Sequence, residues 1–145
     1  MQFELTDSRR LTGANLYWER PSAIIDVSIK GVPQEIIAAW EQAARKWLDP
    51  VGYSEQKTCY RIFDGGASLL ISAPIDVLYS MCELNEVAWE LVLAETTGQQ
   101  RAATDAEITR LLHSIADERK PELLALQKAA RDRGVPFLWD DDECS

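Results

Sequence analysis

The side chains best suited to nucleophilic chemistry are a single histidine, His113, and three cysteines, Cys59, Cys82 and Cys144. A thiol nucleophile requires an imidazole within about 4 Å, close to hydrogen-bond reach. The apolar pattern around His113 places it on the solvated flank of a helix, and an odd number of widely spaced cysteines fits neither a disulfide framework nor a zinc site. Reduced thiols, buried at positions 59 and 82, are therefore the favoured interpretation. A hydrolase that uses Cys59 or Cys82 with His113 is the weaker alternative.

Known catalytic motifs are absent from the sequence, which contains no phosphate-binding loop, dinucleotide-binding fingerprint, zinc-protease helix or nucleophile elbow. Asp140–Glu143 is a run of carboxylates, but it lacks the alternating spacing of a calcium-binding loop. We therefore expect no catalytic residue, no metal site and no cofactor in this chain, and we do not expect it to be an enzyme by itself.

Four carboxylates recur at helical spacing in the middle of the chain: Asp76, Glu83, Glu86 and Glu90. At 100° per residue they fall within an arc of about 80°, nearly opposite the apolar stripe of the same helix. No lysine or arginine lies within 74–100. A solvated helix back is the favoured interpretation, because amphipathic helices need a polar side. The alternative is a ligand-binding strip of Glu83, Glu86 and Glu90 for a cationic peptide or polymer.

A second candidate ligand-binding site consists of arginines around a short loop. Arg9, Arg10 and Arg20 lie on either side of a turn that contains Asn15. Guanidinium groups bind carboxylates or phosphates in a bidentate manner, so these residues suit an anionic ligand. The simpler interpretation is that three surface arginines beside acidic neighbours keep the loop soluble.

The net charge of −9 argues against some classes of partner. Acidic residues cluster within 76–95 and 140–143, and no basic stripe offsets them. Such a surface repels nucleic-acid backbones and anionic lipids, so a cationic partner is favoured. The sequence also lacks the run of roughly 20 apolar residues that a membrane helix needs, and residues 1–10 lack the apolar run of a signal peptide. We expect a soluble, cytoplasmic protein that binds neither nucleic acid nor membrane.

Strand patterns are confined to the first half of the chain. Apolar alternation and β-rich composition predict strands at Gln2–Leu5, Ala23–Ile29, 57–63 and 67–72. The last two are joined by Asp64-Gly65-Gly66, which predicts a hairpin because glycine supplies the positive φ of such turns. Residues 7–21 are expected to form an ordered loop.

Helical spacing predicts four helices, which begin at Pro33, Pro74, Thr104 and Pro121. The first ends at Asp49-Pro50, the second just before Gly98 and the fourth at Gly134. The second has the clearest amphipathic pattern. In the third, the inward residues are Ile108, Leu111, Leu112 and Ile115.

These elements predict a single α+β domain over residues 1–139, with a small, mainly antiparallel or mixed sheet, helices on one face and a C-terminal helical hairpin. Val135–Trp139 is expected to dock on this domain, because an exposed Phe-Leu-Trp triplet would promote aggregation. Residues 140–145 are expected to form an acidic disordered tail or the start of a linker.

Two segments resemble a known family. They are Leu11-Thr-Gly-Ala-Asn-Leu-Tyr-Trp18 before the strand Ala23–Ile29, and Asn85-Glu-Val-Ala-Trp-Glu-Leu91. Over roughly residues 9–98 the chain resembles the N-terminal domain of cyanophycin synthetase and related Mur-ligase-like proteins. That family has Leu-Arg-Gly-Pro-Asn before the first core strand, a Gly-Gly hairpin, and a helix with Glu-His-Val-Ala-Leu-Glu-Leu.

The match is residue by residue. The residues that carry over are Gly13, Asn15, Val87, Ala88, Glu90 and Leu91, and Gly65-Gly66 occupies the place of the family's Gly-Gly pair. Thr12, Ala14 and Glu86 stand where the family has Arg, Pro and His, so roles tied to those family residues do not transfer.

The resemblance implies a non-catalytic N-terminal domain that binds a substrate or polymer for an ATP-dependent amide ligase. A whole family member continues into ATP-grasp and Mur-ligase-like regions, which carry out the ATP-dependent chemistry. The implied partners are a cationic peptide or polymer and the downstream ligase domains. The alternative is a self-standing protein-interaction adaptor or a homodimerisation domain.

Overall fold

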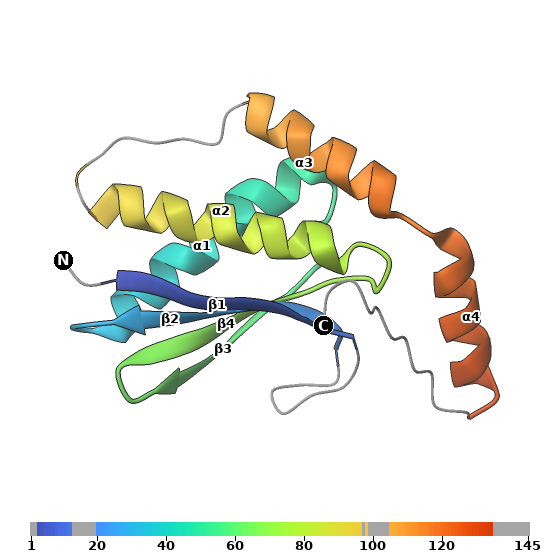
Figure 1. Cartoon of the computed structure of the whole chain (residues 1–145), viewed down its shortest axis with the longest axis horizontal. Coiled ribbons are helices and arrows are strands. Elements are labelled where there is room, and N and C mark those ends of the chain that lie inside the picture. Colours follow the sequence, from blue (N-terminus) through green and yellow to red (C-terminus); the bar gives the residue numbers. More distant parts are fainter. Residues whose placement is uncertain (1–2, 13–19, 97, 99–104, 135–145) are drawn as a thin grey trace.

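The computed structural model describes residues 3–12, 20–96, 98 and 105–134. The elements within these ranges are β1 (Phe3–Leu11), β2 (Ser22–Ile29), α1 (Pro33–Val51), β3 (Thr58–Phe63), β4 (Gly66–Ser72), α2 (Leu78–Thr96), α3 (Asp105–Glu118) and α4 (Pro121–Asp132). Figure 1 shows the sheet covered on one face by α1 and α2, with α3 beyond them and α4 projecting from the end of α3. This arrangement confirms the predicted α+β class.

The sheet has four strands in the described part of the chain, in the order β1-β2-β4-β3, and all neighbours are antiparallel. Because β2 and β3 both run antiparallel to β4, they are parallel to each other. Parallel strands need a crossover connection, and α1 supplies it. β4 then returns between β2 and β3 through the predicted hairpin, leaving β1 and β3 as the two edges of the sheet.

The core lies between the sheet and the helices. Strand residues that point to this side are Ala23, Ile25, Val27 and Ile29 of β2 and Ala67, Leu69 and Ile71 of β4. Trp40 and Trp47 of α1 and Trp89 of α2 fill the space above them, and each is at most 1% exposed. Burial of large aromatic side chains contributes much of the hydrophobic stabilisation of a small domain. On the opposite face of the sheet, Ile24 and Leu70 are also fully buried.

The first strand is longer than its sequence pattern suggests. The predicted strand ended at Leu5 and a loop was expected from residue 7, but β1 continues to Leu11. A β-bulge at Thr6 shifts the register between Leu5 and Asp7. Leu5 packs against the core, whereas Asp7 after the bulge faces the other side of the sheet. The bulge therefore allows a charged sequence to continue as a strand.

The second helix is buried far more completely than an amphipathic helix. It begins at Leu78, because Pro74–Val77 forms a turn in which the Val77 N–H donates to the Pro74 carbonyl at 3.1 Å. Helix α2 is surrounded by β1, β2, α1 and α3, and buried residues occupy most of its circumference. The amphipathic prediction was wrong, because α3 covers part of the side expected to face water. The residues of α2 that stay half-buried or exposed include three carboxylates at helical spacing, which we call the acidic band: Glu83, Glu86 and Glu90.

The last two helices differ in how they pack. In α3, Leu111 and Ile115 are buried as predicted, but Leu112 is 41% exposed, so its predicted inward position was wrong. Helix α4 begins at Pro121 and is followed by Gly134 with φ +67°, as predicted. In Figure 1 it turns away from α3 after a two-residue connection. Three predictions concern residues outside the described ranges: the cap at Thr104, the docking of Val135–Trp139 and the tail over 140–145.

Candidate functional site

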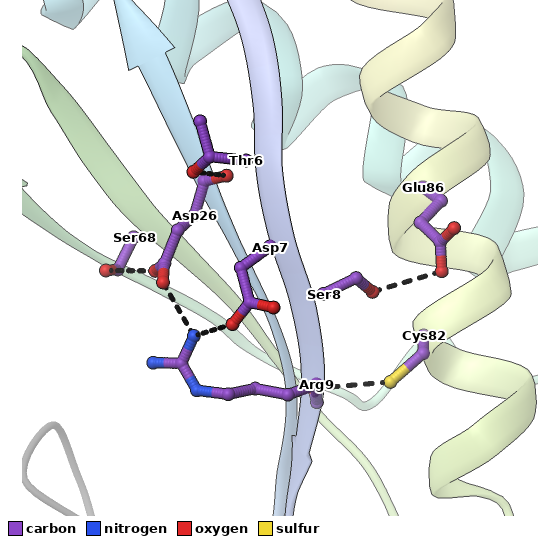
Figure 2. Close-up of polar contacts among 8 residues, drawn as sticks. All are labelled: Thr6, Asp7, Ser8, Arg9, Asp26, Ser68, Cys82 and Glu86. Carbon is purple, nitrogen blue, oxygen red and sulfur yellow. Dashed lines mark hydrogen bonds and ion pairs between the residues drawn. The ribbon is translucent and has the colours of Figure 1, made fainter. Parts of the chain in front are cut away.

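The acidic band runs along α2 where this helix passes β1 and α3. Glu86 Oε2 accepts a hydrogen bond from Ser8 Oγ of β1 at 3.0 Å, as Figure 2 shows. Glu83 Oε1 accepts one from Ser114 Oγ of α3 at 3.2 Å. Both carboxylates are half-buried, and Glu90 is exposed. Two neighbouring elements therefore orient the first two carboxylates of the band.

Serine hydroxyls orient these carboxylates without neutralising them. Helix α2 contains no lysine or arginine. Among the ion pairs formed by described residues, none involves Glu83 or Glu86. Arg10 of β1 lies beside the start of α2, where its guanidinium carbon is 5.5 Å from the centroid of the Tyr79 ring. An oriented carboxylate that keeps its charge is suited to bind a cationic group.

Cys82 of α2 is buried beside the acidic band, and burial is the main influence on its thiol. Burial raises the pKa of this thiol to about 12, and the nearby Arg10 acts in the opposite direction. The carboxylates of three residues add to the rise: Glu86, Glu118 and Glu83. The Cys82 thiol also donates to the Arg9 carbonyl at 3.3 Å. Because the thiolate is the reactive form, Cys82 is poorly suited to act as a nucleophile near neutral pH.

The predicted Cys–His alternative is not supported at Cys59 either. Cys59 lies opposite Leu70 in the β3–β4 ladder, so its side chain is on the face of the sheet away from the helices. His113 is exposed on α3, which lies on the helical side. The sheet therefore separates Cys59 from His113.

Asp76 does not belong to the acidic band. It precedes α2 and is only 4% exposed. Asp76 Oδ2 accepts a hydrogen bond at 3.1 Å from the backbone N–H of Lys120, the N-cap residue of α4. Asp76 therefore helps to cap this helix. Glu118 makes the reciprocal connection by accepting hydrogen bonds from the Tyr79 and Ser80 amides at the start of α2. No local pattern in the sequence predicts these caps, because each carboxylate is distant along the chain from the helix that it caps.

The three predicted arginines do not form one cluster. Arg9 Nη1 lies 2.6 Å from Asp26 Oδ2 and 2.7 Å from Asp7 Oδ2, and Asp26 Oδ1 accepts from Ser68 Oγ at 2.7 Å (Figure 2). Burial lowers the pKa of Arg9, but its bonds to the two aspartates outweigh burial and raise it. Arg9 is thus part of a bridge across β1, β2 and β4.

Arg10 is on the other side of β1, over the Tyr79 ring, so the two adjacent arginines point to opposite faces of the sheet. Arg20 is exposed just before β2. Asn15, the fourth member of the predicted site, lies outside the described residues. The geometry of the described residues therefore favours the acidic band over the arginine site.

Neither a metal cluster nor a membrane-spanning helix is found in the described part of the chain. No group of three or more His, Cys, Asp or Glu side chains is arranged to hold a metal ion in the ranges given above. The helices described there are also too short or too polar to cross a bilayer.

The residues that carry the family resemblance have structural roles where they are described. On α2, Val87, Ala88 and Leu91 are buried in the core. At the hairpin, a Cβ on Gly66 would collide with the Val27 carbonyl oxygen, so only glycine fits there. Comparison of the sequence with protein-family models and with curated proteins finds no match.

Proposed function

We propose that this chain is a non-catalytic domain that binds a cationic peptide or polymer for an ATP-dependent amide ligase resembling cyanophycin synthetase. The observation that carries the proposal is the hydrogen bonding of Glu83 and Glu86. Their carboxylates are held by Ser114 and Ser8, which are neutral, and the charge of these two carboxylates is available to a ligand.

A guanidinium-bearing polymer fits the chemistry of the acidic band. Carboxylates that are already oriented lose little side-chain entropy when a ligand binds, so more of the interaction energy contributes to affinity. Guanidinium groups bind carboxylates through charge-assisted, bidentate hydrogen bonds. The spacing of Glu83, Glu86 and Glu90 along successive turns suits a ligand with repeated cationic side chains.

The resemblance supports the division of labour in this proposal. Downstream ligase regions of the family supply the ATP-dependent chemistry, and the N-terminal domain holds the polymer near them. In this chain the matching residues Val87, Ala88 and Leu91 fix α2 in the core, and Glu90 lies on its exposed side. The family-like segment thus builds the helix that presents the acidic band.

The proposal is tested by a triple variant, Glu83→Gln, Glu86→Gln and Glu90→Gln. Glutamine keeps an oxygen that accepts the serine hydrogen bonds but removes the charge. We expect the variant to bind an aspartate–arginine oligomer at least about tenfold more weakly than the wild type at low salt. The matched control replaces three exposed carboxylates elsewhere with glutamine: Glu35, Glu55 and Glu122. An equal loss of affinity in the control would show that only net charge matters, and this would contradict a specific band.

The alternative function, an adaptor or homodimerisation domain, is favoured by a different observation. Strand β3 has three exposed apolar side chains at the edge of the sheet: Tyr60, Ile62 and Phe63. A domain that only assembles would use this edge and would bind no cationic polymer. Polymer binding and self-association are separate measurements, so the two functions can be distinguished in the same preparation.

A further inference from the structure

The two edges of the sheet differ in how they are protected against pairing with another chain. β1 has a bulge at Thr6 and charged side chains along its length, both of which discourage a further strand. β3 lies at the other edge of the sheet (Figure 1). It has six residues, no proline and an unbroken register with β4. Its side chains Tyr60, Ile62 and Phe63 are 47%, 40% and 44% exposed. The β3 edge is therefore the one suited to accept another strand.

The backbone groups on this edge can be assigned from the ladder. The Lys57 carbonyl accepts a hydrogen bond from the Ser72 N–H at 2.8 Å, so the backbone of Lys57 points toward β4. Backbone directions alternate along an antiparallel strand, and the N–H and C=O groups of Thr58, Tyr60 and Ile62 therefore point outward. The side chains of the same three residues lie on the helical face, because Tyr60 is opposite Leu69 of the core.

We propose that two copies of this chain pair through β3, antiparallel, about a two-fold axis at Tyr60, to form one continuous sheet. Tyr60 of one copy lies opposite Tyr60 of the other, and Thr58 lies opposite Ile62. All three residues then exchange the backbone hydrogen bonds that their outward groups can make. The exposed faces of Tyr60 and Ile62 cover each other across the axis, which is the self-complementarity that an isologous dimer requires.

Charge selects this register over its neighbours. A two-fold axis perpendicular to the sheet keeps the helices of both copies on one face, so residues that face the helices must pair with each other. A register centred on Cys59 would place Lys57 opposite Arg61, and a register centred on Arg61 would place two arginines opposite each other. Like charges directly opposite destabilise a strand pair. With the axis at Tyr60, Arg61 is opposite Cys59 and Lys57 is opposite Phe63.

The same charges favour a second copy over an unrelated strand. Lys57 and Arg61 repel a basic segment that pairs with this edge. A second copy places an uncharged side chain opposite each cation. The proposal does not rest on the acidic band, so the triple glutamine variant should self-associate as the wild type does.

Disulfide trapping tests the register. Hydrogen-bonded antiparallel pairs have Cα atoms about 5.5 Å apart, which a disulfide can span. In a chain with Cys59→Ser and Cys144→Ser, Tyr60→Cys should form a covalent dimer at least about tenfold faster than Leu126→Cys in the same background. Leu126 is the matched control because it is 59% exposed on α4. Equal rates of cross-linking would overturn the proposed axis.

Sedimentation equilibrium over a concentration series tests the interface itself. Ile62→Lys adds a charge to the edge without disturbing the core, and it should raise the dimer dissociation constant at least about tenfold. Leu126→Lys, which makes the same change on α4, should leave the constant unchanged. A wild-type chain that stays monomeric at every concentration, or a dimer that Ile62→Lys does not weaken, would contradict the proposal.

Discussion

Glu118, the last residue of α3, caps the start of α2 by accepting hydrogen bonds from Ser80, at 2.7 Å from its N–H and 2.8 Å from its Oγ. Glu118 Oε2 also accepts from the Tyr79 N–H at 2.8 Å. The first amides of a helix have no partner within the helix, and a carboxylate there also interacts favourably with the helix dipole. This one side chain thus joins α3 to the helix at the centre of the domain.

Replacing Glu118 by alanine should therefore destabilise the whole domain. We expect Glu118→Ala to lower the free energy of unfolding by about 1–2 kcal/mol, the usual effect of removing a helix cap. Urea denaturation measures the change, with the exposed neighbour Asp117→Ala as the control. Identical midpoints for the two variants would show that the cap contributes nothing.

A second prediction concerns Asn85, which is fully buried on α2. Its Oδ1 accepts from Trp40 Nε1 at 2.8 Å, and its Nδ2 donates to the Leu69 carbonyl at 3.1 Å and the Ala23 carbonyl at 3.4 Å. Asn85→Ala leaves the indole N–H unpaired and creates a cavity, so it should cost about 2–4 kcal/mol. In the Trp40→Phe background, which has no indole N–H, the same change should cost less. An unchanged cost there would exclude coupling between the two side chains.

The hairpin glycines show why some predictions from sequence were accurate. Asp64-Gly65-Gly66 predicted the turn because positive φ is a local requirement, and Gly65 has φ +86°. The two ends of α4 were also predicted from local requirements. Proline suits the first turn of a helix, as at Pro121, and glycine supplies the positive φ after the last turn, as at Gly134. The alternation of apolar and polar residues over Ala23–Ile29 also predicted β2, because successive side chains of a strand point to opposite faces of the sheet.

The inaccurate predictions involve contacts between distant residues. Nothing near Asp7 or Arg9 indicates a strand, because β1 depends on a bulge and on Asp26, which is distant in sequence. Likewise, Glu83 appears solvated when α2 is considered alone, and only the packing of α3 brings Ser114 to it. The acidic band could thus be predicted as a set of residues, but not its serine partners.

The third prediction concerns Gly66, where the hairpin approaches β2. A methyl group there would meet the Val27 carbonyl oxygen and the Phe63 ring. Gly66→Ala should cost about 3 kcal/mol or more, because a backbone atom cannot move aside cheaply. Gly65→Ala has open space and should cost about 1 kcal/mol for its positive φ alone. Thermal unfolding compares them, and a larger loss for Gly65→Ala would contradict the steric argument.

The fourth prediction is a pH dependence that arises from Cys82. Its pKa is raised from 9.0 to about 12 in the folded protein, so the unfolded chain loses this proton first as pH rises. Cys82 therefore stabilises the fold below pH 9, and this contribution declines between about pH 9 and about pH 12. Cys82→Ala should flatten the decline of stability over that range. If the free energy of unfolding of Cys82→Ala falls with pH as steeply as that of the wild type, other groups cause the decline.

Calorimetry of the wild-type chain with two matched oligomers tests most directly whether the acidic band binds guanidinium groups. One oligomer carries aspartate and arginine, and the other carries citrulline, which is uncharged, in place of arginine. We predict saturable binding of the arginine oligomer at low salt, weaker binding at high salt and none with citrulline. The triple variant of Glu83, Glu86 and Glu90 should abolish the difference between the oligomers. Equal binding of both by the wild type, or no binding of either at low salt, would contradict the account.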